Sequence, residues 1–298
     1  MASSPYLGKR IFLATKHQKE RVVQIPFLRR LGATVICSSD FDTDTLGTFS
    51  GSVERTLTPR EAAIKKATIA AKISPDGLGL GSEGSVGPDP HIPFISTNEE
   101  IVAFVDLNLK LTSVARRVDR NPEYRVLEIK ESYEVASVVS SFRYLPYGVV
   151  LVGVPEIRSV PFSFLSGPKG RLMEIARGIS SPDELSAALF NAFAESKFES
   201  IKVATDFRAH MNPRRMLNIG RAARALVEKL RNSCPRCLAP GYDFVKPIPG
   251  LPCEVCSTLS DYPVREVWGC GVCGYQAERA RVDGVSSLPS QYCAYCNP

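Results

Sequence analysis

Cysteines near the C-terminal end of the chain have the spacing of metal ligands. Eight of the nine cysteines lie after residue 233 and form four Cys-x-x-Cys pairs, separated by 15, 13 and 19 residues. The pairs are Cys234/Cys237, Cys253/Cys256, Cys270/Cys273 and Cys293/Cys296. Two such pairs supply the four thiolates of one tetrahedral zinc site. The sequence therefore predicts two structural zinc ions in a zinc-ribbon-like module over residues 232–298.

The intervals of 15 and 19 residues fit the zinc-ribbon spacing of two knuckles that share one ion, but the spacing leaves the pairing of the four knuckles open. Sequential, interleaved and nested pairings all give two four-cysteine sites. Disulfides or a redox dithiol are the alternative, although a redox Cys-x-x-Cys motif normally occurs singly. A zinc ion with four thiolates has no open position for water, so the module is expected to hold shape and to offer a surface to RNA or to a protein. Trp268 and Tyr275 are expected in its small core, with stacking on a base as the alternative.

Phosphate-binding residue types follow the first apolar run of the chain, Ile11–Ala14. Thr15, Lys16 and Lys19 come directly after this expected strand, where a helix is expected to begin. Hydroxyl and ammonium donors at the start of a helix are well placed to bind phosphate groups. We therefore expect these three side chains to contact a nucleotide or another phosphorylated small molecule.

Two carboxylates and a further lysine occur between residues 58 and 84. Glu61 and Lys66 lie on an expected helix, and Ser82 and Glu83 lie in a Gly-rich segment after an expected strand. Glu61 and Glu83 are predicted to hold a catalytic Mg²⁺, while Lys66 and Ser82 are predicted to bind phosphate. The alternative for Glu61 is a purely local role, because the run from Thr58 to Glu61 is also a capping box.

These motifs resemble a known enzyme family. The run Glu61–Ala67 is similar to the E-N-A-x-x-K-A helix of the inosine/xanthosine triphosphate pyrophosphatases, and Ala14–Lys19 resembles their S/T-x-N-x-x-K loop. Gly81–Gly84 resembles the acidic loop that holds metal in that family. The resemblance covers about the first 110 residues, with His17 and Ala62 where the family has asparagine. It implies a nucleotide-pyrophosphatase-like fold and Mg²⁺-dependent release of pyrophosphate.

Nearly the whole chain is also similar to a bacterial domain-of-unknown-function family, which implies no activity. The segments that carry this similarity are Ala14–His17, Asp42–Gly51, Ser82–Ser85, Thr205–Pro213 and Cys293–Pro298.

A second polar cluster lies between an expected strand and an expected helix. It contains Asp206, Arg208 and His210, followed by Asn212, and alternate positions of an extended segment point to one side. We expect Asp206 and His210 to act as an acid–base pair and Arg208 to bind phosphate. The alternative is an Asp–Arg ion pair beside an Asn-Pro helix cap.

The elements that position these residues alternate between strand and helix. Strands are expected at 11–14, 34–38, 78–81, 101–105, 149–152 and 201–205, and a Gly/Pro-rich loop is expected from the end of the third of these to Pro88. Helices are expected up to about Leu31, where Pro26 kinks or ends the helix, from Thr58, from Ser181 to about Ala194, and from Asn212. This alternation predicts an α/β body with one or more mixed sheets, followed by the cysteine-rich module.

Length, net charge and the absence of long apolar runs limit the number of domains and the classes of function that the sequence allows. The 298 residues suit about two domains, and we expect divisions at 1–110, 111–231 and 232–298. The net charge of +6 suits a polyanionic ligand without requiring one. No apolar run is long enough for a membrane span and no signal peptide is evident, so we expect a cytoplasmic protein. The preferred function is metal-dependent nucleotide binding, with pyrophosphohydrolysis as its enzymatic form; the alternative is a non-catalytic RNA- or protein-binding adaptor.

Overall fold

The structure is a computed structural model of the chain. It describes residues 4–15, 17–38, 57–89, 91–122, 124–142, 147–155, 173–195 and 197–298. Lys16 and the segment Asp42–Gly51, both singled out in the sequence, lie outside the described residues.

The first sheet has five strands in the order β2-β1-β3-β4-β5. Its strands are β1 (Arg10–Ala14), β2 (Thr34–Ser38), β3 (Leu78–Pro88), β4 (Ser96–Asp106) and β5 (Leu111–Asp119). β1 pairs in parallel with β2 and β3, whereas β3, β4 and β5 are joined antiparallel. The sheet is therefore mixed, as the sequence predicts.

Helices cover both faces of this sheet. On one face, α1 (Glu20–Leu31) and α5 (Pro213–Arg231) pack side by side over a large apolar core. On the other face, α2 (Pro59–Ile73) packs through a row of alanines. A Cβ atom at Gly79 or Gly81 would collide with the backbone of α2. These glycines are therefore what allows α2 to approach β3 so closely.

One local prediction is wrong, and one of two alternatives at Pro26 is excluded. β3 does not break into a loop after Gly81 but continues to Pro88, and each of its residues pairs with a residue of β4. The glycine-rich sequence misled because here the glycines serve close packing rather than a turn. Pro26 does not end α1, which runs on to Leu31 and closes with Gly32 in the left-handed conformation.

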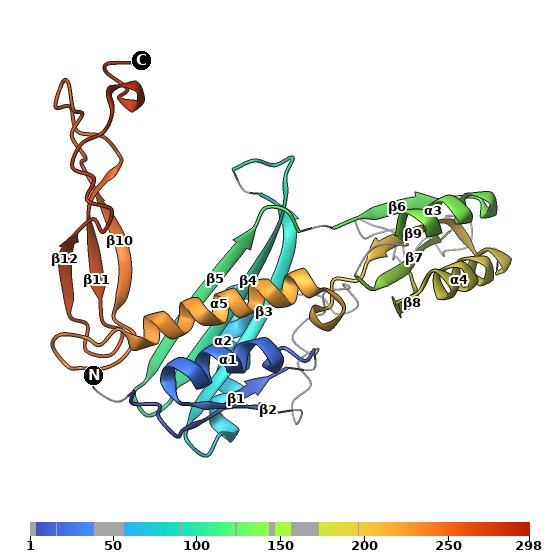
Figure 1. The fold of residues 1–298 in the computed structure, drawn as a ribbon, viewed down its shortest axis with the longest axis horizontal. Coiled ribbons are helices and arrows are strands. Elements are labelled where there is room, and N and C mark those ends of the chain that lie inside the picture. Colours follow the sequence, from blue (N-terminus) through green and yellow to red (C-terminus); the bar gives the residue numbers. More distant parts are fainter. Residues whose placement is uncertain are drawn as a thin grey trace, which may run out of the picture.

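A second, four-stranded antiparallel sheet has the order β6-β9-β7-β8. Its elements are β6 (Val126–Ile129), α3 (Val135–Phe142), β7 (Val149–Pro155), β8 (Met173–Ile179), α4 (Pro182–Ala194) and β9 (Phe198–Thr205). The sheet and its two helices share one apolar core. α5 then runs from the end of this unit across the first sheet toward the cysteine module (Figure 1).

The cysteine module forms an arm beyond α5 (Figure 1). Its three-stranded antiparallel sheet has the order β10-β11-β12, with β10 at Asp243–Pro249, β11 at Pro263–Gly269 and β12 at Gln276–Ala280. The predicted fold class, a mixed α/β body with a C-terminal cysteine-rich module, is confirmed. Among the described residues, no helix is long and apolar enough to cross a membrane.

The predicted domain boundaries at residues 110 and 231 stay predictions, but sheet membership bears on where they are drawn. β5 begins at Leu111 and completes the first sheet, and α5 packs against β4 and β5 of that sheet. The region 111–231 thus contributes its first strand and its last helix to the N-terminal layer. The second sheet is inserted between them.

Candidate functional site

The eight C-terminal cysteines form two quartets. Cys234, Cys237, Cys270 and Cys273 make one, and Cys253, Cys256, Cys293 and Cys296 make the other. Within each quartet the four sulfur atoms lie within 4.8 Å of one another, and the closest sulfur pairs are 3.7–3.9 Å apart. Sulfurs bound at ~2.3 Å to one tetrahedral zinc ion are about 3.8 Å apart. The geometry thus fits two zinc sites, and no disulfide joins these cysteines.

The pairing of the knuckles is interleaved, and the three-stranded sheet explains why. Along the chain, β10, β11 and β12 each separate one knuckle from the next. Because each strand crosses the length of the arm, successive knuckles emerge at opposite ends. The first and third knuckles therefore meet at the end beside α5, and the second and fourth meet at the far end.

All four knuckles have the same turn. The backbone N–H of the residue after the second cysteine donates to the carbonyl of the first, at 2.9–3.1 Å. In three of the knuckles that residue has a left-handed backbone conformation with a positive φ, namely Leu238, Ser257 and Gly274. Backbone N–H groups of Arg236, Val255 and Val272 also approach the sulfur of the first cysteine at 3.4–3.5 Å. These turns point the thiolates inward and stabilise their negative charge.

Aromatic residues form the small core beside the first quartet. Tyr242 is buried, and Trp268 and Tyr275 pack against it. The Arg279 guanidinium lies 4.9 Å from the ring centre of Tyr242 and 4.7 Å from that of Trp268. This arrangement favours the core role for Trp268 and Tyr275 over the base-stacking alternative, because both rings already have partners.

Around the start of α1, five charged side chains that are distant in sequence share one buried region. Lys19, Lys66 and Arg215 carry positive charge, and Glu83 and Glu100 carry negative charge. These five buried side chains carry one more positive than negative charge, which makes this cluster the second candidate site.

Lys19 is the charge that lacks a carboxylate partner. Its side chain is 7% exposed, and within the described part of the chain its ammonium bonds only to the carbonyl and hydroxyl oxygens of Ser82, at 3.2 and 3.3 Å. Burial lowers the pKa of Lys19 to about 8. Glu83 and Glu100 act against this fall in pKa, and Arg215 and Lys66 add to it. Within the described residues, the partners of this buried cation are thus neutral oxygens and not a carboxylate.

Lys66 and Glu83 form an ion pair on the α2 face of the sheet. Their Nζ and Oε2 atoms are 2.6 Å apart, and both side chains are nearly buried. The other oxygen of Glu83 accepts from the N–H of Gly84 at 3.3 Å. The structure therefore brings together Lys19, Lys66, Ser82 and Glu83, all of which the sequence singles out.

Arg215 and Glu100 were missed as members of this cluster. Glu100 is fully buried, and the Nε and Nη2 atoms of Arg215 donate to its two oxygens at 2.6 and 3.2 Å. A Cβ atom at Gly84 would collide with this pair, so Gly84 makes room for it. The sequence offers a glutamate beside the apolar run Ile101–Val105, and its pairing with Gly84 is evident only in the structure.

The second polar cluster lies beside the loop that follows β1. The rings of His17 and His210 stack with centroids 5.2 Å apart and planes at 13°. Burial, with a smaller contribution from Arg208, lowers the pKa of His210, and Asp206 acts against this fall. Asp206 is buried and bonded to the Nε and Nη2 atoms of Arg208 at 2.6–3.0 Å.

The expected extended segment after Thr205 is only partly present. A 3₁₀ turn at Ala209–Met211 ends the extended segment. The next residue, Asn212, caps α5 by accepting a hydrogen bond from the N–H of Arg215. The Asp–Arg ion pair and the Asn-Pro cap are therefore both present. Asp206 and His210 as catalytic residues, and Arg208 as a phosphate ligand, stay predictions.

The remaining predicted site residues stand apart from the lysines. Glu61 is exposed, and its carboxylate accepts from the hydroxyl and N–H of Thr58 at 2.7 and 2.9 Å, which lowers the pKa of Glu61. Within the described residues it bonds to nothing else. Thr15 is buried at the end of β1 and its hydroxyl accepts from the N–H of His17.

Fold and cysteine geometry together define an α/β protein with a zinc-ribbon-like arm. The family model described as Domain of unknown function (DUF6671) matches residues 66–298, and the chain belongs to this family. The predicted resemblance to a domain-of-unknown-function family is thereby confirmed over residues 66–298. No curated protein and no solved structure matches the chain. The resemblance to the triphosphate pyrophosphatases stays a prediction.

Proposed function

We propose that the chain binds a nucleotide or another phosphorylated small molecule at the buried basic cluster. The observation that supports this is Lys19, whose buried ammonium has only two oxygens of Ser82 as partners within the described residues. Burying an ammonium without an anion is costly, and a phosphate group would offset that cost with a charge-assisted hydrogen bond. Lys66 is close enough to Lys19 to act on its pKa and supplies a second ammonium donor.

The enzymatic form of this proposal is Mg²⁺-dependent cleavage of a nucleoside triphosphate to monophosphate and pyrophosphate. In it, a water attacks the α-phosphorus and the bond to the pyrophosphate oxygen breaks. The two cysteine quartets are the only described groups of three or more metal-ligating side chains. A magnesium ion here would thus take Glu83 and the phosphates of the ligand as its oxygen donors, which is the usual coordination of nucleotide-bound Mg²⁺.

The test is a panel of nucleoside triphosphates, including the inosine and xanthosine forms, with Mg²⁺ or Mn²⁺. Affinity is measured by calorimetry, and released pyrophosphate and phosphate are assayed separately. Lys19→Met and Lys66→Met should weaken binding at least ~10-fold, because each removes a charged donor. Lys65→Met is the matched control, since Lys65 is the exposed neighbour of Lys66.

The outcomes separate binding from catalysis. Pyrophosphate release that is lost in Glu83→Gln while binding survives supports the enzyme. Binding without release supports a non-catalytic nucleotide-binding protein. Affinity that is unchanged in Lys19→Met overturns the proposal.

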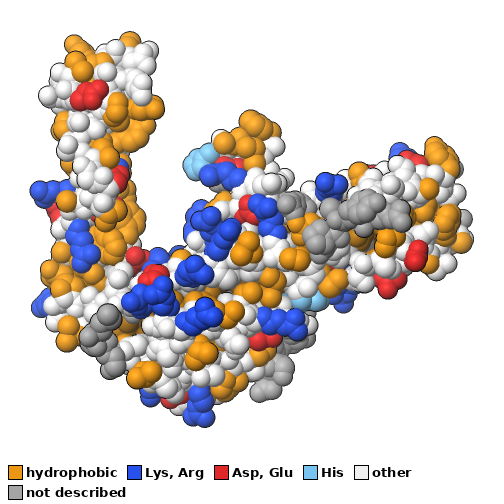
Figure 2. All heavy atoms as spheres, viewed as in Figure 1, with side chains coloured by type: hydrophobic (Ala, Val, Ile, Leu, Met, Phe, Trp, Pro, Cys, Tyr) orange, Lys and Arg blue, Asp and Glu red, His pale blue; other side chains and the backbone are white. Residues whose placement is uncertain are grey.

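The second candidate function is docking of a partner through the zinc arm. Residues 232–298 carry five Lys and Arg against six Asp and Glu, and each four-thiolate zinc site adds a formal charge of −2. The outer segments 250–264 and 284–298 contain no Lys or Arg at all. On the face that Figure 2 shows, the far end of the arm is hydrophobic and acidic. This charge favours a protein partner over RNA.

The basic helix gives little support to RNA binding either. Arg214 bonds to Asp119 at 2.6 Å and lowers the pKa of Asp119 to about 2, and Arg221 bonds to Asn218. An RNA partner would show an affinity that falls steeply with salt and falls further when Arg214, Arg221 and Arg224 are replaced by Ala. Unchanged affinity in that triple variant would rule out the helix as an RNA contact.

A further inference from the structure

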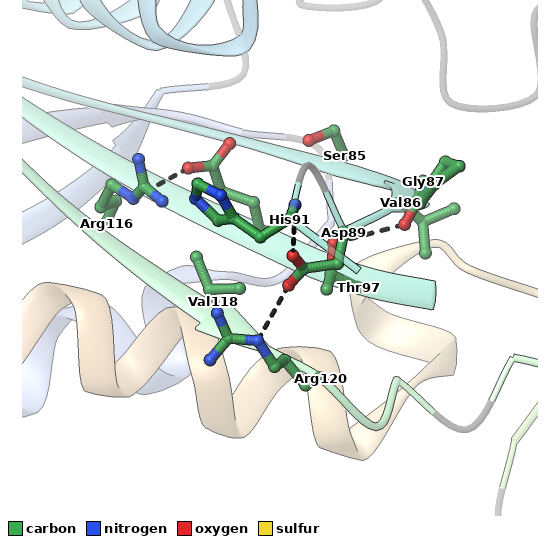
Figure 3. Close-up of a pocket in the computed structure, with 11 residues that line it drawn as sticks. Ser85, Val86, Gly87, Asp89, His91, Thr97, Arg116, Val118 and Arg120 are labelled. Atoms are coloured by element: carbon green, nitrogen blue, oxygen red, sulfur yellow. Dashed lines mark hydrogen bonds and ion pairs between the residues drawn. The ribbon is translucent and has the colours of Figure 1, made fainter. Parts of the chain in front are cut away.

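A small pocket lies on the first sheet, over a part of β3, β4 and β5 that α2 does not cover (Figure 3). Its volume is about 320 Å³, at the lower end of the range for small-molecule sites. α2 contacts β3 through Gly79 and Gly81, and the pocket begins at Ser85 of the same strand. None of the residues of the Lys19 cluster lines it.

Strand register explains which side chains face the pocket. Ser85 pairs with Glu99 and Gly87 pairs with Thr97, while Glu99 pairs with Val118 of β5. Since alternate residues of a strand share a face, Arg116 and Val118 of β5 lie on the same face as Ser85 and Gly87, and Arg120, directly after β5, also lines the pocket. The pocket therefore has an apolar floor at Val118 with an arginine at each end.

Both arginines are oriented by a carboxylate that leaves their outer N–H groups available. The Nε atom of Arg120 donates to Asp89 at 2.8 Å, and the Nε atom of Arg116 is 3.1 Å from Glu99. Within the described residues, the Nη atoms of these two arginines make no hydrogen bond. A guanidinium held by its Nε presents its two Nη groups as a fixed pair of donors, which matches the two oxygens of a carboxylate or phosphate.

The turn after β3 forms a fixed wall of the pocket. Asp89 is 1% exposed and accepts from the N–H groups of His91 and Ile92 at 2.8 and 3.1 Å, and its own N–H donates to Ile95. The bond from His91, followed by the bond from Arg120, lowers the pKa of Asp89 and keeps it charged. This turn places His91 beside the arginines at the pocket (Figure 3).

We propose that this pocket is a second ligand site, which binds a small molecule through a phosphate or carboxylate group held by the Nη atoms of Arg116 or Arg120. His91 and the hydroxyl of Ser85 supply further hydrogen bonds to the same ligand. The two ion pairs cancel in charge, so recognition rests on the oriented donors rather than on net charge. The site is independent of the proposed phosphate site at Lys19.

The experiment measures binding of pyrophosphate and of citrate to the full zinc-loaded chain by calorimetry. All variants carry Lys19→Met, which weakens the proposed phosphate site, so that affinity lost in a further variant reports on the pocket. Arg116→Ala and Arg120→Ala should each raise Kd about 10-fold or more. Arg117→Ala is the matched control, because Arg117 is exposed and its position in the register puts it on the opposite face of the sheet.

Gly87→Leu is a second variant that fills the pocket without removing a charge. A Cβ atom at Gly87 meets nothing within 4 Å, so a side chain there enters open space. This variant should abolish binding of both probes. If it fails to fold, as circular dichroism would show, the arginine variants carry the test.

Each outcome decides the matter. Binding of pyrophosphate alone supports a phosphate ligand, binding of citrate alone supports a carboxylate ligand, and binding of both supports a general oxyanion site. The proposal is overturned if neither probe binds the Lys19→Met chain. It is also overturned if Arg117→Ala weakens binding as much as Arg116→Ala does, or if a folded Gly87→Leu chain binds normally.

Discussion

The cysteine arm and the Lys19 cluster both bring together polar groups whose burial without a partner costs free energy, but the partners differ between the two regions. In the arm, eight thiols lie in two quartets whose sulfur spacing fits a zinc ion. In the cluster, Lys66 and Arg215 each have a carboxylate, and Lys19 has only the oxygens of Ser82 among the described residues. The quartets of the arm are thus arranged around a ligand position, whereas the described part of the cluster is held by its own side chains and carries one more positive than negative charge. The comparison separates a structural ligand site from a candidate recognition site.

Zinc removal should have the largest effect and should be confined to the arm. Apparent binding energies of structural zinc are ~10–16 kcal/mol, and the core of the arm beside each quartet is small. A strong chelator should therefore unfold residues 232–298 and leave the first sheet intact. Hydrogen exchange resolved by segment measures this directly, and elemental analysis should give two zinc ions per chain.

Single cysteine variants sharpen that result. Because the quartets are interleaved, Cys270→Ser should remove the zinc next to α5, and Cys293→Ser should remove the distal zinc. Each variant should retain about one zinc ion per chain. A sequential pairing predicts instead that Cys234→Ser and Cys253→Ser damage the same site, so loss of only one ion in the double variant would contradict the interleaved arrangement.

Breaking the Arg215–Glu100 pair should have the next largest effect. Both side chains are almost completely buried, so Arg215→Met leaves the Glu100 carboxylate without its partner. The expected loss is about 3–5 kcal/mol in the free energy of unfolding of the first sheet. The double variant Arg215→Met/Glu100→Leu should recover much of this loss. Urea unfolding followed by far-ultraviolet circular dichroism tests both, and equal losses in the single and double variants would contradict an ion-pair role.

The two regions also differ in how far they can be predicted from sequence. The zinc ligands were all identified because each knuckle is local and its chemistry needs only spacing. The pairing was not, since it depends on three strands that carry successive knuckles to opposite ends of the arm. Strands and helices were predicted well where apolar runs and capping residues coincide, as at Ile11–Ala14 and Thr58–Glu61.

The buried cluster shows where such reasoning fails. Lys19, Lys66 and Glu83 were found through motifs, but Glu100 and Arg215 lie more than a hundred residues apart and meet only because α5 packs across β4. Gly81–Gly84 was taken for a loop, since the sequence does not reveal that those glycines make room for α2 and for Arg215. Long-range packing, rather than local propensity, decides both features.

Replacing Lys19 should raise stability while removing recognition. The pKa of Lys19 falls from 10.5 to about 8 in the folded chain, so folding with the charged lysine costs roughly 3 kcal/mol below that pH. Between these two values the unfolded chain holds a proton that the folded chain has lost, and stability therefore rises with pH. Lys19→Met should be more stable than the natural chain at pH 7, and this gain should vanish near pH 10. A gain that does not depend on pH would contradict the titration of Lys19.

The affinity for a phosphate ligand should change with pH in the opposite sense. An anion stabilises the ammonium form of Lys19, so binding requires proton uptake once the free protein is above its pKa of about 8. Affinity should be constant from pH 6 to 7.5 and then fall by up to ~10-fold per pH unit. Calorimetry in buffers of different ionisation enthalpy would detect the proton uptake. In Lys19→Met the remaining affinity should not show this decline.

The smallest expected changes in stability are at Thr58 and Glu61, and they test whether Glu61 is a helix cap or a metal ligand. Thr58 and Glu61 bond reciprocally at the start of α2, where the hydroxyl of Thr58 also accepts from the N–H of Glu61. Thr58→Ala should therefore cost ~1 kcal/mol of stability, and Glu61→Gln should cost less because an amide can still fill the capping position. If Glu61 is only a cap, Glu61→Gln leaves Mg²⁺-dependent nucleotide affinity unchanged, while Glu83→Gln alters it. Both Glu61→Gln and Thr58→Ala weaken the cap, but only Glu61→Gln removes the carboxylate. A loss of affinity in Glu61→Gln without a matching loss in Thr58→Ala would therefore make Glu61 part of the site.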